Sequence, residues 1–334
     1  MSARINTYCL IIWMSLLSFG TISCSNWLDV EPKSEIKGDV LFETEQGFED
    51  AITGVYILMT DTRLYGKEMS YGFIEAVAQQ YEIDPLTNNY FDCTQYRYDM
   101  DAVLTRIDGI WSVAYNAIAN VNNILKNLET SSCVTPPVYA RIKGECLGLR
   151  AFLHFDMLRL FGPVYKLNPK AESIPYNETS KVMALPLLAA DSVIHEKVLR
   201  DLDEAESLLA DSDPVIEGGP MASLEDDQDV YLRYRQLRMN YYAVLALKAR
   251  VYLYAGEPGK ALEMARKLLA DAKVNEHFPA VDPNKLLANQ SNPDRVFSTE
   301  VLAGIYKKDR KDIYTGYFDS EQAGNNYLHP RKDF

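Results

Sequence analysis

Residues 142–163 read IKGECLGLRAFLHFDMLRLFGP and contain a long helical pattern. Apolar side chains return every three or four residues, which places them on one face of a helix. Phe161-Gly162-Pro163 ends the pattern, because proline cannot continue a helix. The stretch therefore predicts a long helix with this face in the core. The face consists of Ile142, Cys146, Leu149, Leu153, Met157 and Leu160.

Two further stretches carry the same kind of stripe. The earlier one ends at segment 129–137, which is rich in helix breakers. Such a short break predicts that the two long helices are antiparallel neighbours. The later stripe has acidic residues on its other side, which we expect to face solvent. The earlier stripe is Ile107, Trp111, Ala114, Ile118, Val121, Leu125 and Leu128; the later one is Ile194, Val198, Leu202, Ala205 and Leu209, and its acids are Asp201, Asp203, Glu204 and Glu206.

Segment 241–270 predicts a helical hairpin interrupted at Gly256–Gly259. Ala249, Tyr252 and Ala261 match the spacing of a tetratricopeptide repeat, although Lys248 stands where that repeat has a larger apolar residue. Stacked hairpins bury a shared core that no single hairpin could bury alone. The sequence therefore predicts an all-α fold of tetratricopeptide-like hairpins stacked as an α-solenoid.

Long irregular segments separate these helices, at residues 60–105, 162–190 and 211–230. The first contains a short apolar stretch near 73–78 that predicts a small helix. Loops longer than about 15 residues on a rigid scaffold are usually functional or disordered. We therefore expect the functional residues to lie in these loops.

The first 23 residues are typical of an export signal. Arg4 precedes an uncharged apolar run from Tyr8 to Phe19, which is shorter than the roughly 20 residues of a membrane span. Ile22-Ser23-Cys24 resembles a bacterial lipobox, which predicts cleavage before Cys24 and attachment of lipid to its thiol. The alternative is ordinary secretion, with Cys24 left as a plain thiol. We expect a tether over 24–43 and a helical domain over 44–334.

Composition and charge exclude several classes of function. The chain is 47% hydrophobic and 24% charged, a globular balance. Its formal charge of −13, which becomes −14 once Arg4 is removed with the signal, repels phosphate backbones, so we expect no nucleic-acid partner. The four histidines are scattered, and neither a CxxC nor a GxSxG motif is present. We therefore expect no metal, no cofactor and no catalytic residues. The cysteines beyond the anchor are Cys93, Cys133 and Cys146, of which Cys146 is expected to be a small buried hydrophobe.

An ordered series of motifs resembles the SusD/RagB family of outer-membrane lipoproteins, through nearly the whole mature chain. The most specific is GECLGLRA at 144–151, followed by FGPV at 161–164. The others are LDVEPKS at 28–34, FEDAITGVY at 48–56, DLDEA at 201–205 and ARVYL at 249–253. Members of this family normally continue well beyond the segment that resembles residues 294–301, so the resemblance implies a C-terminally shortened chain.

The resemblance implies a role outside the cell. Such a lipoprotein lies over a SusC-like TonB-dependent transporter in the outer membrane, binds an oligosaccharide or another nutrient, and acts as a lid for its import. Membrane attachment is expected through the lipid alone. Two other classes stay open: a helical-repeat scaffold that binds proteins, and, less favoured, a glycoside hydrolase.

One loop has the side chains that glycan binding requires. Aromatic rings stack on the apolar faces of sugars, while amides and charged groups bond to the hydroxyls. The alternative is that its tyrosines only close the loop onto the helices. The candidate glycan-binding residues are Asn88, Asn89, Tyr90, Gln95, Tyr96, Arg97 and Tyr98.

The first prediction concerns lipid attachment at Cys24. The mature protein extracted from membranes should begin at Cys24 and carry acyl chains, since each buried CH₂ stabilises attachment by about 0.8 kcal/mol. Intact-mass spectrometry measures both features. An unlipidated protein, or one that begins at another residue, would contradict the prediction.

Overall fold

The computed structural model describes residues 38–181, 183–220, 230–284, 294 and 296–332. The predicted signal over 1–23, the anchor Cys24 and the tether up to residue 37 lie outside the described residues. The chain divides into two compact units, one ending at Leu41 and the other beginning at Phe42. The first unit contributes the short helix α2 (Gly38–Leu41), and the following description concerns the second.

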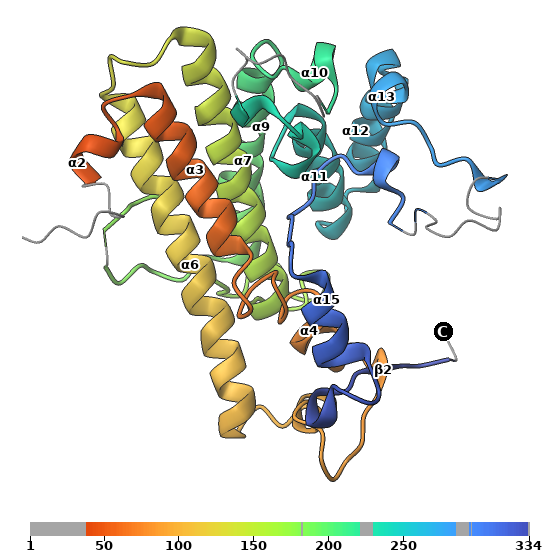
Figure 1. The fold of residues 1–334 in the computed structure, drawn as a ribbon. Helices are drawn as coiled ribbons and strands as arrows, with labels where there is room; N and C mark the ends of the chain where they lie inside the picture. The colour runs from red at the N-terminus through yellow and green to blue at the C-terminus, as the bar shows by residue number, and fades with distance from the viewer. Residues whose placement is uncertain (1–37, 182, 221–229, 285–293, 295, 333–334) are drawn as a thin grey trace, which may run out of the picture. The chain divides into compact units, whose positions relative to one another are not determined.

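The second unit is built mainly from helices (Figure 1). The longest are α3 (Glu45–Met59), α6 (Asp101–Glu129), α7 (Pro136–Phe161), α9 (Leu199–Leu209), α11 (Tyr241–Tyr254) and α12 (Pro258–Ala270). The shorter helices are α4 (Phe73–Val77), α5 (Phe91–Thr94), α8 (Ala190–Ser192), η2 (Val193–Val198), α10 (Val215–Gly218), η3 (Val230–Leu232), η4 (Arg235–Leu237), α13 (Ala272–His277), η5 (Ser298–Glu300), α15 (Arg310–Ile313), η6 (Tyr314–Phe318) and η7 (Gly324–Asn326). Two short strands, β1 (Tyr81–Glu82) and β2 (His329–Pro330), pair antiparallel.

Helix α7 lies at the centre of this unit. Figure 1 shows α3 and α6 beside it on one side, and α9 packs against another of its faces. The predicted stripe residues Ile142, Leu149 and Leu153 are at most 1% exposed. The expected all-α fold and the long helix over 142–161 are therefore confirmed.

Two glycines let other elements approach α7 closely. A Cβ atom at Gly144 would lie 2.7 Å from Cγ of Leu209, in α9, and a Cβ at Gly148 would lie 2.5 Å from Cγ of Met239. Real Cβ atoms do not come this close to their neighbours. Small residues at these two positions therefore set how near α9 and the Met239 segment lie to α7.

Helices α11 and α12 form the tetratricopeptide-like hairpin expected from the sequence. The Asn240 side chain accepts a hydrogen bond from the Ala243 N–H at 2.9 Å and caps the start of α11. Gly256, with φ +77°, makes the turn, and Pro258 occupies the first turn of α12. Lys248 is buried, and its ammonium group lies 2.7 Å from Oδ1 of Asp203 and also contacts Glu206. Ion pairs to α9 therefore replace the apolar contact usual at that position.

The acidic side of α9 departs from the prediction. Asp203 and Glu204 are exposed, as expected. Asp201, however, is 0% exposed, and its carboxylate binds the Arg150 guanidinium of α7 with an N···O distance of 2.6 Å. The expectation that Asp201 faces solvent is therefore wrong, because a cation 51 residues earlier in the chain compensates the buried charge.

Other expectations agree with the structure. The small helix α4 lies within the predicted 73–78 stretch, and Cys146 is fully buried. Burial raises the pKa of the Cys146 thiol well above its usual value, and the neighbouring Glu145 charge adds to the effect. Trp111 is half-buried and packs on Tyr115 and Phe161.

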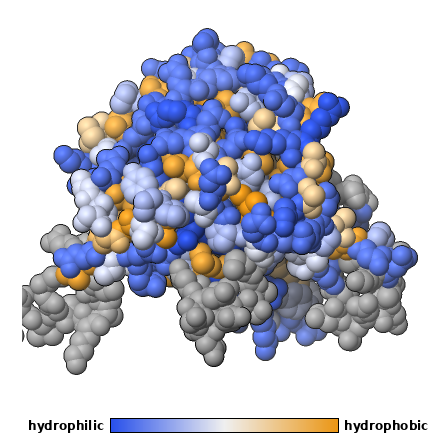
Figure 2. Space-filling view, turned by 90° about the horizontal axis from the view of Figure 1, so that it is seen from above, coloured by the Kyte–Doolittle hydropathy of each residue, from blue (hydrophilic) through white to orange (hydrophobic). Residues whose placement is uncertain are grey.

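The described surface is mainly polar. In Figure 2 hydrophilic side chains predominate on the end seen from above, and apolar ones form small separate groups. None of the described helices has both the length and the apolar character needed to cross a membrane.

A pair of leucines tests the assignment of the core. Replacing Leu153, which is 0% exposed, by Ala should lower the free energy of unfolding by about 2 to 5 kcal/mol, because the substitution leaves a cavity beside α7. Replacing Leu253, which is 65% exposed, should change it by less than about 0.5 kcal/mol. Urea denaturation measures both values. Equal effects would show that Leu153 is not enclosed.

Candidate functional site

The predicted glycan-binding loop folds around a buried tyrosine. Tyr90 is 0% exposed, and its hydroxyl donates to the Glu68 carboxylate at 3.3 Å. The Arg106 guanidinium lies 4.1 Å from the centre of the Tyr90 ring and donates to Glu68 at 2.6 Å. Burial and the Glu68 charge both raise the pKa of Tyr90. Tyr90 therefore fastens the loop to α6, and its buried ring is not accessible to a ligand in this structure.

Asn88 and Asn89 connect this loop to a segment more than 230 residues later. The Asn88 amide donates to the Tyr327 carbonyl at 2.5 Å, and its oxygen accepts from the Tyr90 N–H at 2.8 Å. The Asn89 amide donates to Oδ1 of Asn326 at 2.9 Å. Both amides thus stabilise the loop, and Asn89 alone of the two is exposed. No local pattern in the sequence predicts these bonds, because the bonded residues are more than 230 positions apart.

The remaining four candidates, Gln95 to Tyr98, lie together on the surface. Tyr96 is 51% exposed and Tyr98 is 47% exposed, and their ring centres are 6.4 Å apart. Between them, the Arg97 guanidinium donates to Asp92 at 3.0 Å and leaves about half of its side chain exposed. Gln95 donates to Oγ1 of Thr94 and is also exposed. This exposed surface, called the Gln95–Tyr98 platform below, combines two rings, an amide and a cation.

The backbone of this platform is held in an uncommon conformation. Tyr96 has φ +55° and Gln79 has φ +61°, which is the left-handed region that few residues other than glycine adopt. The Gln79 amide donates both to the Thr94 carbonyl at 2.7 Å and to the Tyr96 hydroxyl at 3.3 Å. Conformations of this kind persist where their surroundings fix them, and they are often found at ligand sites.

A second polar region lies between α6, α7, α9 and residues 178–181, where a pocket of about 480 Å³ opens. Three of the carboxylates that line it, Glu178, Asp201 and Glu204, have cationic partners. Burial alone would raise the pKa of Asp201, but hydrogen bonds from Arg150, Tyr176 and Arg200 outweigh that effect and lower it. The pKa of Glu178 is lowered in the same way, since Lys197 and Arg200 overcome the effect of burial. A general acid needs the opposite shift.

His154 is part of the packing beside this pocket. Its ring is fully buried, stacks on Tyr176 at 3.9 Å, and has both nitrogens engaged. Nδ1 lies 2.9 Å from the Arg150 carbonyl, and Nε2 accepts from the Asn177 N–H at 2.9 Å. Among the described residues, no group of three or more His, Cys, Asp or Glu side chains is arranged to hold a metal ion.

Comparison with known proteins identifies the family. A model of SusD-like proteins, described as starch-binding and associating with the outer membrane, matches residues 26–217, which is more than half of the chain. The chain belongs to this SusD-like family. SusD-like protein P25 of Formosa agariphila is 20% identical over 304 residues, and SusD-like protein P38 of the same organism is 26% identical over 208. These matches cover 87% and 60% of this SusD-like chain but only 50% and 37% of the relatives' own lengths.

Solved structures of SusD-like proteins share the fold. A SusD superfamily protein from Bacteroides vulgatus superposes with a TM-score of 0.55 at 17% identity, covering 87% of this chain and 56% of that one. A SusD-like carbohydrate-binding protein from the same organism gives a TM-score of 0.52 at 21% identity, covering 69% and 45%. NanU of B. fragilis superposes with a TM-score of 0.54 at 15% identity, and the match covers 86% of this chain and 53% of NanU. At these identities the likeness concerns the fold.

The buried His154 predicts how stability depends on pH. Burial lowers the pKa of His154 to about 3. The unfolded chain takes up the proton near pH 6.5, whereas the folded protein does not, so stability is full above about pH 6.5 and falls as the pH drops toward 3. Between pH 6.5 and 5, His154 should reduce the free energy of unfolding by about 2 kcal/mol.

The His154→Gln variant should lack this part of the pH dependence. Urea unfolding of parent and variant at pH 7 and pH 5 measures the difference, and the His329→Gln variant, which removes a histidine outside this network, should behave like the parent. If parent and His154→Gln lose the same stability on acidification, the buried neutral state of His154 is wrong.

Proposed function

We propose that this chain is a lipid-anchored, non-enzymatic protein of the outer membrane that binds an oligosaccharide through the Gln95–Tyr98 platform. The observation that carries the proposal is the exposed pair Tyr96 and Tyr98, in a chain whose family is described as starch-binding. Two rings that lie 6.4 Å apart offer apolar faces to a sugar, while Gln95 and Arg97 offer donors to its hydroxyls.

The platform is suited to binding because its position is fixed before a ligand arrives. Tyr90 is buried against Glu68 and Arg106, and Asn89 bonds to Asn326, so the segment that leads to the rings is tied to other elements. The Gln79 amide adds a bond to the Thr94 carbonyl, directly before the platform. A preformed contact surface loses less conformational freedom on binding. This rigidity favours recognition of an extended ligand by few side chains.

The absence of catalysis is supported by the state of the carboxylates. Glycoside hydrolysis uses two carboxyl groups across a cleft, one of them with a raised pKa. In the polar pocket beside α7, Asp201 and Glu178 are bound to cations and have lowered pKa values. Binding without cleavage is therefore the function that this arrangement favours.

Two further parts of the proposal follow from the sequence motifs. Lipid on Cys24 would attach the protein to the membrane, and the tether over 24–43 would let the helical domain over 44–334 stand away from the surface. A SusC-like TonB-dependent transporter would receive the bound oligosaccharide. We propose an outward-facing location on the same grounds.

A second candidate function is a scaffold that binds other proteins. Leu262 and Leu269 lie seven residues apart on the same face of α12, and they are 49% and 67% exposed. Apolar residues at this spacing on an exposed helix are typical of a surface that packs against another helix. Glycan-array binding that is lost on changes at the platform would favour the oligosaccharide.

A double substitution tests the platform. Tyr96→Ala/Tyr98→Ala should weaken binding about tenfold or more for a neutral oligosaccharide identified on a glycan array, because each stacked ring contributes about 1 kcal/mol beyond the buried area. Isothermal titration calorimetry gives the affinity, and chromatography of the sugar after incubation should recover it intact.

The matched control is Phe297→Ala/Tyr314→Ala. These two aromatic residues are 47% and 57% exposed but lie outside the platform, so their removal should leave the affinity for the neutral sugar within about twofold. Equal losses for the two double variants would place the site elsewhere. Cleavage of the sugar would overturn the non-enzymatic assignment.

A further inference from the structure

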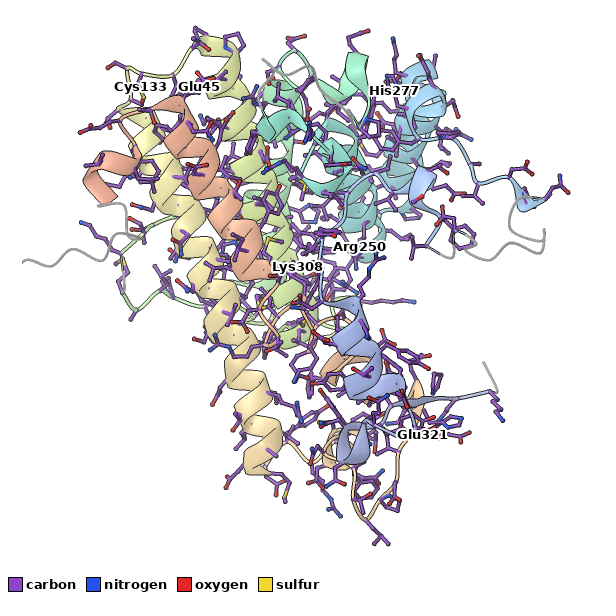
Figure 3. The ribbon with its side chains drawn as sticks, in the orientation of Figure 1. Glu45, Cys133, Arg250, His277, Lys308 and Glu321 are labelled. Carbon is purple, nitrogen blue, oxygen red and sulfur yellow. The ribbon has the colours of Figure 1, made fainter. Side chains whose placement is uncertain are left out.

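A groove of about 710 Å³ opens between the second half of α3, residues 233–238 and residues 305–309. Its walls are mainly apolar, and no residue of the Gln95–Tyr98 platform lines it. Ile57 of α3 is 66% exposed there. Figure 3 labels Lys308 where the third of these segments approaches α15. This volume lies within the usual range of small-ligand sites, which is about 300 to 1,000 Å³.

Four cationic side chains and one carboxylate line this groove, although the chain as a whole carries −13. The carboxylate, Asp309, lies 3.7 Å from the ammonium of Lys307 and so is already compensated. Arg233 and Lys308 are exposed and form no ion pair with any described residue. The groove therefore offers two cations that no described carboxylate compensates, in a chain with a negative formal charge.

A third cation is held in place by stacking. The Arg238 guanidinium lies 3.8 Å from the ring centre of Tyr231 and 5.4 Å from that of Tyr56. One of its nitrogens, Nη2, donates to Oγ1 of Thr53 at 3.4 Å. The other, Nη1, is buried, has no hydrogen-bond acceptor and lies 4.0 Å from Oε1 of Glu145. Stacking and the Glu145 charge therefore fix Arg238 at the inner end of the groove, where its positive charge is partly compensated.

Tyr234 and Tyr306 add exposed rings to the same groove. Tyr234 has φ +53°, a left-handed conformation that is rare for a tyrosine. The next residue, Arg235, is fully buried and binds Asp213 and Glu145, with N···O distances of 3.1 Å to each. This buried ion pair fixes the backbone at 235 and so holds the Tyr234 ring outside the core.

We propose that this groove is a second binding site, specific for saccharides that carry a carboxylate or sulfate group. The exposed rings of Tyr234 and Tyr306 stack on sugar faces, and Arg233 and Lys308 bind the anionic substituent, while Arg238 adds positive charge at the inner end of the groove. A purely apolar ligand would leave Arg233 and Lys308 without a described partner, and a neutral sugar would not use their charge. The site is independent of the Gln95–Tyr98 platform, since neither shares a lining residue with the other.

The test compares charged and neutral probes by isothermal titration calorimetry on the parent protein. Tetragalacturonate and a sulfated carrageenan tetrasaccharide, which carries no carboxylate, should each bind at least about tenfold more tightly than maltotetraose and methyl-esterified tetragalacturonate at low salt. The preference should shrink at 0.5 M NaCl, because salt screens exposed charges. Comparison of the two acidic probes distinguishes carboxylate from sulfate.

Two double variants locate the charge effect. Arg233→Gln/Lys308→Gln should lower the affinity for the preferred acidic probe about tenfold and leave maltotetraose binding unchanged. Lys126→Gln/Arg266→Gln removes the same net charge from exposed positions elsewhere and should change neither affinity more than about twofold. Tyr96→Ala/Tyr98→Ala should retain binding of the acidic probe, which separates this site from the platform.

Three outcomes would overturn the proposal. The first is equal affinity of acidic and neutral probes for the parent. The second is equal loss in the two charge-removing variants, which would show a general effect of net charge. The third is equally tight binding of hexaglutamate, which would make the groove a site for acidic peptides. Failure of the neutral sugar to bind anywhere would contradict the proposed function but not this groove.

Discussion

The Arg150 guanidinium of α7 donates two hydrogen bonds to the Asp201 carboxylate of α9, at 2.6 and 3.0 Å, inside the protein. The same pair also holds other parts of the chain, because Arg150 donates to Asn122 of α6 and Asp201 accepts from the Tyr176 hydroxyl at 2.6 Å. Removing one partner of a buried pair leaves the other charge without compensation, which typically costs about 3 to 5 kcal/mol. Helix α7 therefore holds α6, α9 and the 162–190 segment together. A second buried carboxylate of α7, Glu145, accepts hydrogen bonds from Tyr56 and Arg235.

Local patterns in the sequence were sufficient to predict the helices but not these long-range pairs. The apolar stripe that contains Leu149 and Leu153 can be recognised from residues within two helical turns. The long helix and the α11–α12 hairpin could therefore be predicted from local sequence. Asp201 has the same local pattern as an exposed acid, and its burial depends on Arg150, 51 residues away. The burial of Lys248 likewise depends on its ion pair with Asp203 of α9. The sequence of the hairpin alone does not indicate that partner.

Distant partners also explain why some residues of the predicted binding loop are buried and others are exposed. Tyr90 and Tyr96 have similar sequence surroundings, yet Glu68 and Arg106 enclose the first, while the left-handed backbone at 96 directs the second outward. Asn88 contributes to the fold because it bonds to the Tyr327 carbonyl, 239 residues later, and no local pattern indicates so distant a partner. The cation-lined groove also arises from three separate segments, so its charge could not be read from any one of them. In this SusD-like chain, a rigid helical core positions exposed loops of different chemistry.

The central claim is that the core is fixed and that the Gln95–Tyr98 platform binds a neutral oligosaccharide. Hydrogen exchange followed by mass spectrometry, with and without that sugar, tests it most directly. The amides of residues 141–158 in α7 should exchange most slowly in both states, because nearly all of these residues are buried. The sugar should slow exchange in residues 88–98 and in the 324–331 segment bonded to them. Slowing confined to the polar pocket between α6, α7 and α9, with no change at residues 88–98, would contradict the account.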